Sequence, residues 1–220
     1  MLKTFRIPIL TIFLVLFIDQ FIKIYIKLNY PLGEVGRLGN WCIIHFTENP
    51  GMAFGMEFGG NYGKLALSVF RILASIAGLF YIRHIIKTKE QPLFIFCVSL
   101  ILAGAMGNIF DSVFYGSMFT ESDDFTTSHY AGFGNGYSGV LYGHVVDMFY
   151  FPIYNGHFPS WVPFWGGEEF QFFRPIFNFA DFAISIGVGL LILFQKRFNK
   201  KEAVVSEAEI PKQEENNLTI

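Results

Sequence analysis

The chain contains four apolar stretches that are each long enough to cross a lipid bilayer: residues 7–28, 65–86, 93–114 and 176–194. A helix needs about 20 predominantly apolar residues to span the hydrocarbon core. The composition agrees, because 52% of the 220 residues are hydrophobic and only 15% are charged. We therefore predict an all-α membrane protein with four transmembrane helices.

The distribution of Lys and Arg predicts the orientation of these spans, because short cytoplasmic loops carry an excess of positive charge. The basic residues gather before the first span, around the link between spans two and three, and after the fourth span: Lys3, Arg6, Arg83, Lys87, Lys89, Lys196, Arg197, Lys200 and Lys201. Both termini are then cytoplasmic. Residues 1–198 form one predicted domain, and the polar tail 199–220 is predicted to be disordered.

The two segments predicted to lie outside, residues 29–64 and 115–175, are long, aromatic and rich in Gly. Trp41 to Phe46 is a β-rich run, and residues 158–167 have the aromatic density of an interfacial segment. We expect a small β-containing cradle on the outer leaflet. Residues 116–143 read as an extended outer loop, and we expect the fold to survive replacement of Phe119 to Tyr137 by a short linker.

Polar side chains interrupt the spans at one depth, near their outer ends. An ionised Asp in a span costs about 2.5 to 3.5 kcal/mol on insertion scales, so such groups indicate function. Each pair is spaced i,i+3 or i,i+4 and so shares a helix face. The pairs are Asp19 with Lys23, Asn108 with Asp111, and Asn178 with Asp181.

Each pair also has a structural interpretation. Asp19 and Lys23 can form an intrahelical ion pair, and the Asn108 pair can hold two helices together. Asn178 is a suitable N-cap, with Asp181 in the first turn of its helix. These interpretations do not explain why all three pairs fall at one depth.

A further carboxylate, Asp147, interrupts the apolar run from Gly143 to Pro152. It can be a turn-forming residue. If its segment folds back on the outer ends of the spans, Asp147 and Asp181 face each other. Two close carboxyl groups share a proton, which supplies one base and one acid for the attack of water on an amide.

A series of short motifs resembles the lipoprotein signal peptidases (type II signal peptidases), which are aspartyl peptidases of the bacterial cytoplasmic membrane. Five motifs in one order are a specific signal. They are DQFIK at Asp19 to Lys23, ENPGMAF at Glu48 to Phe54, GNIFD at Gly107 to Asp111, HVVDMF at His144 to Phe149, and FNFAD at Phe177 to Asp181.

This resemblance implies a catalytic dyad of Asp147 and Asp181. It implies an outward-facing site that removes the signal peptide from diacylglyceryl-modified prolipoproteins, cutting on the N-terminal side of the lipidated cysteine. It implies no metal or organic cofactor, a monomer in contact with membrane lipid, and inhibition by globomycin-type cyclic peptides. The residues implied to bind substrate or support the site are Asn49, Gly51, Asn108, Asp111, Asn178, Asp19 and Lys23.

The sequence also departs from the family pattern. Ser112 stands where an arginine usually follows the aspartate of the third motif, which leaves its role to another residue such as Arg174. Residues 116–143 and the passage from Asp147 to Asp181 are also longer than expected. These additions affect the shape of the outer segments more than the chemistry.

Other functions fit less well. Ser138 lies in a G-x-S-G sequence, but in a loop and without a histidine in a span. The outer residues His129, His144, His157, Asp123, Asp124, Glu168 and Glu169 lack the spacing of metal ligands. A non-catalytic transporter should show an internal repeat or polar groups at the midplane. A net charge of −2 gives no basic surface for nucleic acid.

The two cysteines, Cys42 and Cys97, indicate neither a nucleophile nor a disulfide. Cys42 and His45 make a poor nucleophile pair, because i,i+3 residues on a strand point to opposite faces. Cys42 and Cys97 lie at different predicted depths, so we expect no disulfide between them.

Overall fold

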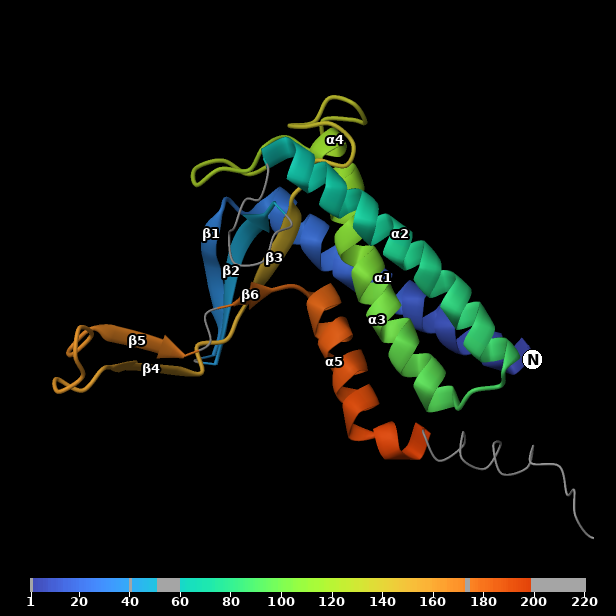
Figure 1. Cartoon of the computed structure of the whole chain (residues 1–220). Helices are drawn as coiled ribbons and strands as arrows, with labels where there is room; N and C mark the ends of the chain where they lie inside the picture. The colour runs from blue at the N-terminus through green and yellow to red at the C-terminus, as the bar shows by residue number, and fades with distance from the viewer. Residues whose placement is uncertain (1, 40, 51–59, 173–174, 199–220) are drawn as a thin grey trace, which may run out of the picture.

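Long helices and a small β-sheet at one end of them make up the protein (Figure 1). This computed structural model describes residues 2–39, 41–50, 60–172 and 175–198. Three helices are long and apolar enough to cross a membrane: α1 (Leu2–Asn29), α2 (Gly60–Lys87), and α3 (Pro92–Phe110) with its helical continuation to Met118. The first three predicted spans are therefore confirmed as helices of spanning length. The predicted tail, 199–220, lies outside the described residues.

The fourth predicted span, residues 176–194, is only partly helical. Helix α5 (Phe179–Leu193) has 15 residues, which at 1.5 Å per residue is about 22 Å against a hydrocarbon core of about 30 Å. Residues 176 and 177 form strand β6 (Ile176–Phe177), because they pair with another strand. The count of four spanning helices is thus not confirmed, and the described residues contain three such helices and a shorter apolar one.

The sheet has four antiparallel strands in the order β1-β2-β3-β6. They are β1 (Gly33–Leu38), β2 (Cys42–Asn49), β3 (Val145–Tyr150) and β6. The predicted β-rich run lies in β2 and is confirmed. Its register places Thr47 opposite Asp147, and β3 in turn places Phe149 opposite Phe177. Because β6 leads into α5, strand pairing sets where α5 begins relative to β3.

A hydrophobic cluster joins the sheet to the helices. Phe46 of β2 and Val146 and Met148 of β3 are fully buried, and they pack with Ile26 of α1 and Tyr115 after α3. Four consecutive residues of β3, 145–148, are buried, so this strand is covered on both faces. Asp147 therefore sits in a strand that is closed off from bulk water.

Small residues let α5 approach α3 closely. A Cβ atom at Gly104 of α3 would lie 2.2 Å from the carbonyl oxygen of Ala180, and one at Gly187 of α5 would lie 2.8 Å from the carbonyl oxygen of Cys97. Close backbone contact of this kind is typical of helices packed in membranes. It places the start of α5 directly against the outer half of α3.

Residues 116–143 differ from the loosely attached loop that the sequence predicts. Phe119, Ser122 and Ser128 are buried, and Phe119 belongs to the central hydrophobic cluster. A Cβ atom at Gly136 would lie 2.2 Å from the carbonyl oxygen of Gly116. The prediction that this stretch tolerates changes in length is therefore wrong for its two ends, because they are core structure.

An ion pair lies beneath this segment. Lys27 of α1 donates hydrogen bonds to Glu48 of β2 and, over 2.9 Å, to Ser122 Oγ. Burial acts to raise the pKa of Glu48, but the hydrogen bond with His144 and the charge of Lys27 outweigh it and hold that pKa below its ordinary value. Residues 116–143 thus cover a pair that joins α1 to the sheet.

Replacing Gly104 with Ala tests the contact between α3 and α5. We expect Gly104→Ala to force the helices apart and lower the free energy of unfolding by about 1 to 3 kcal/mol, as overpacking does. The matched control is Gly189→Ala, because a Cβ there meets no described atom within 4 Å. Thermal unfolding midpoints in detergent measure both variants, and equal midpoints would show that the close contact is absent.

Candidate active site

Asn178 and Asp181 form a reciprocal cap at the start of α5. Asn178 Oδ1 accepts a hydrogen bond from Asp181 N over 3.0 Å, and Asp181 Oδ2 accepts one from Asn178 N over 3.2 Å. The prediction that Asn178 is the N-cap is confirmed. Capping leaves the other carboxylate oxygen of Asp181, Oδ1, available for a second interaction.

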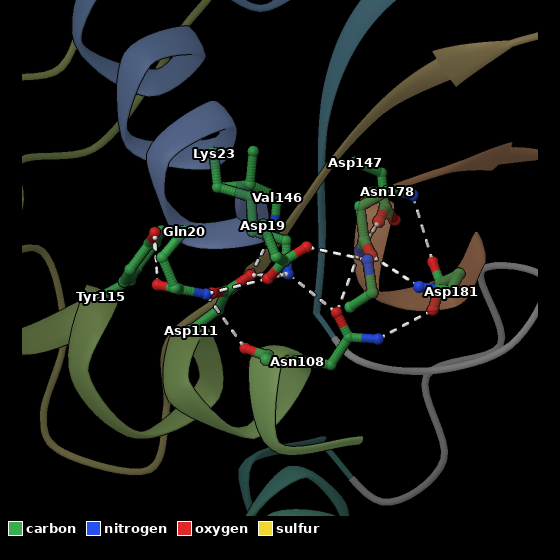
Figure 2. Close-up of polar contacts among 12 residues, drawn as sticks. Asp19, Gln20, Lys23, Asn108, Asp111, Tyr115, Val146, Asp147, Asn178 and Asp181 are labelled. Carbon is green, nitrogen blue, oxygen red and sulfur yellow. Dashed lines mark hydrogen bonds and ion pairs between the residues drawn. The ribbon is translucent and has the colours of Figure 1, made fainter. Parts of the chain in front are cut away.

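That second interaction comes from α3. Asn108 Nδ2 donates to Asp181 Oδ1 over 2.8 Å (Figure 2). The amide orientation of Asn108 is fixed, because its Oδ1 accepts from Lys23 Nζ over 2.9 Å and a lysine can only donate. Asp181 is therefore held from its own helix and from α3.

Asp147 approaches the same point from β3. Its Oδ1 accepts a hydrogen bond from Asn178 Nδ2 over 2.7 Å, and the same Nδ2 donates to Asn108 Oδ1 over 3.0 Å. The side chain of Asn178 thus links Asp147 to the backbone of Asp181. Burial, followed by the charge of Asp181, raises the pKa of Asp147 to about 7.

Lys23 is the hub of a fully buried network behind these two aspartates (Figure 2). Its Nζ lies 3.0 Å from Asp19 Oδ2 and 2.8 Å from Asp111 Oδ2. The intrahelical pair of Asp19 and Lys23 therefore exists. It is also part of the site, because Lys23 reaches Asn108 as well.

The two acidic partners of Lys23 each brace one side of the site through the backbone. Asp19 Oδ1 accepts from Ala180 N over 2.9 Å, next to Asp181. Asp111 Oδ2 accepts from Val146 N over 3.2 Å, next to Asp147. One buried ammonium group therefore connects the supports of α5 and β3.

Sequence reasoning missed two members of this network. Gln20 Nε2 donates to Asp111 Oδ1 over 2.8 Å, and Tyr115 donates its hydroxyl to Gln20 Oε1 over 3.0 Å. Gln20 lies in the DQFIK motif, which was the available signal. Tyr115 ends a π-helical turn, Asp111–Tyr115, of a kind that is frequent at functional sites.

Arg71 of α2 was also missed. It is half-buried and interacts electrostatically with Asp181 and Asp147. Gly78 of α2 lies beside Leu102 of α3. The two helices run in opposite directions and both rise 1.5 Å per residue, so Arg71, seven residues before Gly78, lies at about the level of Asn108, six residues after Leu102. No motif marked this residue, since it lies within an apolar run.

The remaining predicted site residues are less fully placed. Asn49 pairs with Val145 at the end of β2, two residues beyond the position opposite Asp147. Gly51 and Arg174 lie outside the described residues. Ser112 donates its hydroxyl to the carbonyl oxygen of Asn108 over 3.0 Å, so it stays within its own helix.

The outer histidines do not gather into a metal site. His144 approaches Glu48 with 3.5 Å between Nδ1 and Oε2, while His129 contacts Thr120. Among the described residues, no group of three or more His, Cys, Asp or Glu is placed to hold a metal ion. Cys42 and Cys97 are both buried free thiols.

Comparisons with known proteins identify the family of the chain. Residues 11–196 match the family described as signal peptidase (SPase) II. The chain is 49% identical over 187 residues to a lipoprotein signal peptidase of Porphyromonas gingivalis, covering 84% of this chain and 81% of that one. It is 38% identical over 203 residues to a lipoprotein signal peptidase of Amoebophilus asiaticus, covering 88% and 81%.

A solved structure described as a bacterial membrane enzyme shares the fold. It superimposes with a TM-score of 0.54 at 23% sequence identity, covering 94% of this chain and 93% of that one. The family match spans most of the chain, and two relatives exceed 30% identity over most of its length. The chain therefore belongs to the signal peptidase II family of aspartic peptidases.

Proposed function

We propose that this protein removes the signal peptide from diacylglyceryl-modified prolipoproteins by cutting on the N-terminal side of the lipidated cysteine, with Asp147 and Asp181 as the catalytic pair. The supporting observation is that Asn178 and Asn108 hold the two aspartates side by side: the Asn178 side chain bonds the carboxyl group of Asp147 and Asn108 Oδ1, and Asn108 Nδ2 bonds the carboxylate of Asp181. The family supports signal peptide removal from lipoproteins. The assignment of the pair rests on the geometry and on the motifs.

The two carboxyl groups differ in a way that suits acid–base hydrolysis. Asp147, with its pKa raised to about 7, holds a proton near neutral pH and serves as the acid. Asp181 accepts hydrogen bonds from Asn108 and from the backbone of Asn178, which suits an ionised carboxylate. Asp181 therefore serves as the base.

In this mechanism Asp181 takes a proton from water, whose oxygen attacks the carbonyl carbon of the scissile amide. Asp147 gives its proton to the carbonyl oxygen. The attack and this proton transfer together produce a tetrahedral intermediate with two hydroxyl groups. The carbon–nitrogen bond then breaks while Asp181 returns its proton to the leaving nitrogen and Asp147 recovers a proton from the hydroxyl group. Both residues end in their starting states. The steps use only water and the two carboxyl groups, so they need no metal or cofactor.

The buried network fixes the two carboxyl groups before substrate binds. Asp19 and Asp111 accept from backbone N–H groups beside the pair, and Lys23 bonds both of them, so we assign all three positioning roles. Asn108 and Asn178 contact the pair directly. Asn49, with Gly51 after it, remains a proposed contact for the extended peptide, because the end of β2 lies beside Asp147.

The proposed substrate carries its acyl chains in the leaflet where the site lies. The pair sits where the sheet meets α3 and α5, at one end of the long helices (Figure 1). A lipidated peptide can therefore reach it from the side without leaving the bilayer. Cyclic peptides of the globomycin type are expected to compete there, and we propose that a monomer is sufficient.

We also propose that the chain crosses the membrane a fourth time. Asp181 meets Asn108 near one end of α3, and the carbonyl oxygen of Arg197 accepts from Gln91 Nε2 over 3.0 Å at the other end. Residues 178–198 thus run the length of α3. The bacterial cytoplasmic membrane, both termini inside and the site at the outer leaflet complete the proposal.

Exchanging each aspartate for asparagine tests the catalytic pair. We expect Asp147→Asn and Asp181→Asn each to lower cleavage of a diacylglyceryl-modified prolipoprotein by about 10³-fold or more, and the double variant to be little worse, because the pair acts as a unit. Asp124→Asn, in the exposed part of the outer segment, is the control. Substantial cleavage by either single variant with an intact melting profile would contradict the dyad.

The raised pKa of Asp147 predicts a pH-dependent stability difference. Between about pH 4 and pH 7 the folded protein keeps a proton that the unfolded chain has lost, so its free energy of unfolding falls as the pH rises through this range. Asp147→Asn stays neutral and escapes this loss.

We therefore expect the melting temperature of Asp147→Asn to exceed that of the parent increasingly from about pH 5 to pH 7, and by a constant amount above. A tenfold change in proton affinity corresponds to about 1.4 kcal/mol. Asp124→Asn should follow the parent throughout. A difference that shrinks with rising pH would show that Asp147 is held in its ionised form.

Single cysteines test the proposed orientation. Phe125 is exposed in the outer segment and Lys87 is exposed at the end of α2. With both native cysteines buried, Phe125→Cys should react with a membrane-impermeant maleimide in intact cells, and Lys87→Cys only after the cells are lysed. The reverse pattern would overturn the orientation and leave the geometry of the pair untouched.

A further inference from the structure

The tip of the β4–β5 hairpin exposes large aromatic side chains. The hairpin pairs β4 (Tyr154–His157) with β5 (Glu169–Phe172). At its tip Trp161 is 80% exposed, Phe164 95% and Trp165 57%. Large apolar side chains exposed together within five residues indicate a place where a protein meets another apolar phase.

The tip has a defined structure of its own. Phe158 N donates to the carbonyl oxygen of Glu168, and Gly167 N donates to the carbonyl oxygen of Phe158, each over 2.9 Å. The ring of Phe158 packs against those of Phe170 and Trp165, with centroids 5.0 and 6.3 Å apart. These contacts hold the ring of Trp165 against Phe158 and close the tip with backbone hydrogen bonds.

Phe164 is exposed in spite of an unfavourable backbone conformation. Its φ of 71° is a left-handed backbone conformation, which bulky side chains disfavour. The ring of Phe164 is nevertheless 95% exposed, so it gains almost no packing within the protein. A phenylalanine held in this way is explained if the ring is covered by something outside the chain.

The hairpin is connected closely to the membrane-facing part of the fold. It leaves the sheet between β3 and β6 and projects sideways, away from the helices (Figure 1). A row of neighbouring rings runs from Trp41, which is stacked on Phe151, to Phe177, which is tilted against Phe151, with centroids 5.7 and 5.3 Å apart. Phe177 lies two residues before α5 and Phe151 lies three residues before β4, so this row links the chain that enters the hairpin to the start of an apolar helix.

The charge pattern favours lipid over a protein partner. Residues 158–167 contain no charged side chain. The exposed Glu168 and Glu169 lie where the tip joins the start of β5. Tryptophan is enriched where a protein meets the headgroup level of a bilayer, because its ring has an apolar body and a polar N–H. Lipid also lies beside this end of the helices by necessity.

We propose that the β4–β5 hairpin is a membrane-surface anchor whose tip, formed by Trp161, Phe164 and Trp165, inserts into the interfacial region of the leaflet at the sheet end of the helices. This goes beyond the proposed peptidase activity. The anchor attaches the sheet, and with it β3, to the bilayer at a second point beside the helices.

Fluorescence quenching of a single tryptophan tests the anchor without measuring proteolysis. The chain has three tryptophans, so Trp41→Phe with Trp165→Phe leaves Trp161 alone. In vesicles of phosphatidylcholine and phosphatidylglycerol, we expect lipids brominated near the headgroup to quench Trp161 at least about twofold, and aqueous acrylamide to quench it weakly. The control replaces all three tryptophans with Phe and adds Phe125→Trp, at a position that is 92% exposed in the outer segment.

The control tryptophan should show the opposite pattern, with strong acrylamide quenching and little effect of brominated lipid. Adding Phe164→Asp to the Trp161 protein should move Trp161 toward water, since Asp tolerates the left-handed backbone and only the apolar ring is lost. Trp161 open to acrylamide and unaffected by brominated lipid would overturn the anchor. Protection from both quenchers would also overturn it, because a protein surface would then cover the tip.

Discussion

The fold around the candidate site depends on one buried positive charge. Removing an ammonium group from water is costly unless it is paired and fully hydrogen-bonded. Lys23 meets this requirement with two carboxylates and the Asn108 amide oxygen, taken from two helices. Those partners in turn hold the backbone beside Asp181 and Asp147. The contacts that pair the buried ammonium group of Lys23 therefore also hold the candidate site together.

The polar part of the site could be predicted because its residues break a strong apolar pattern. Asp19, Lys23, Asn108, Asp111 and Asn178 stood out in spans where any charge or amide is costly, and the structure brings all five together with Asp181. Asp147 was also found from its apolar surroundings. Tyr115 and Arg71 were not, since an aromatic or a single cation within a span has several ordinary explanations.

The outer segments were harder to predict for a physical reason. Residues 116–143 contain many glycines and hydroxyl-bearing residues, a composition shared by loose loops and by tightly packed chain. Only the contacts of Phe119, Gly136 and Ser122 distinguish the two. The predicted fourth span begins three residues before α5 for a similar reason, because residues 176 and 177 continue the apolar pattern but pair with β3 as strand β6.

The two contacts of Asn178 restrict where residues can be inserted into the chain without moving the candidate site. Its side chain caps α5 and reaches Asp147, so one residue added between β6 and Asp181 would turn the carboxylate about 100° around the helix. The two long outer stretches lie elsewhere, residues 116–143 before β3 and residues 151–175 between β3 and β6. After each of them, strand pairing restores the register before the next aspartate is reached. Insertions in these two stretches can therefore add outer structure while the distance in space between the two aspartates stays constant.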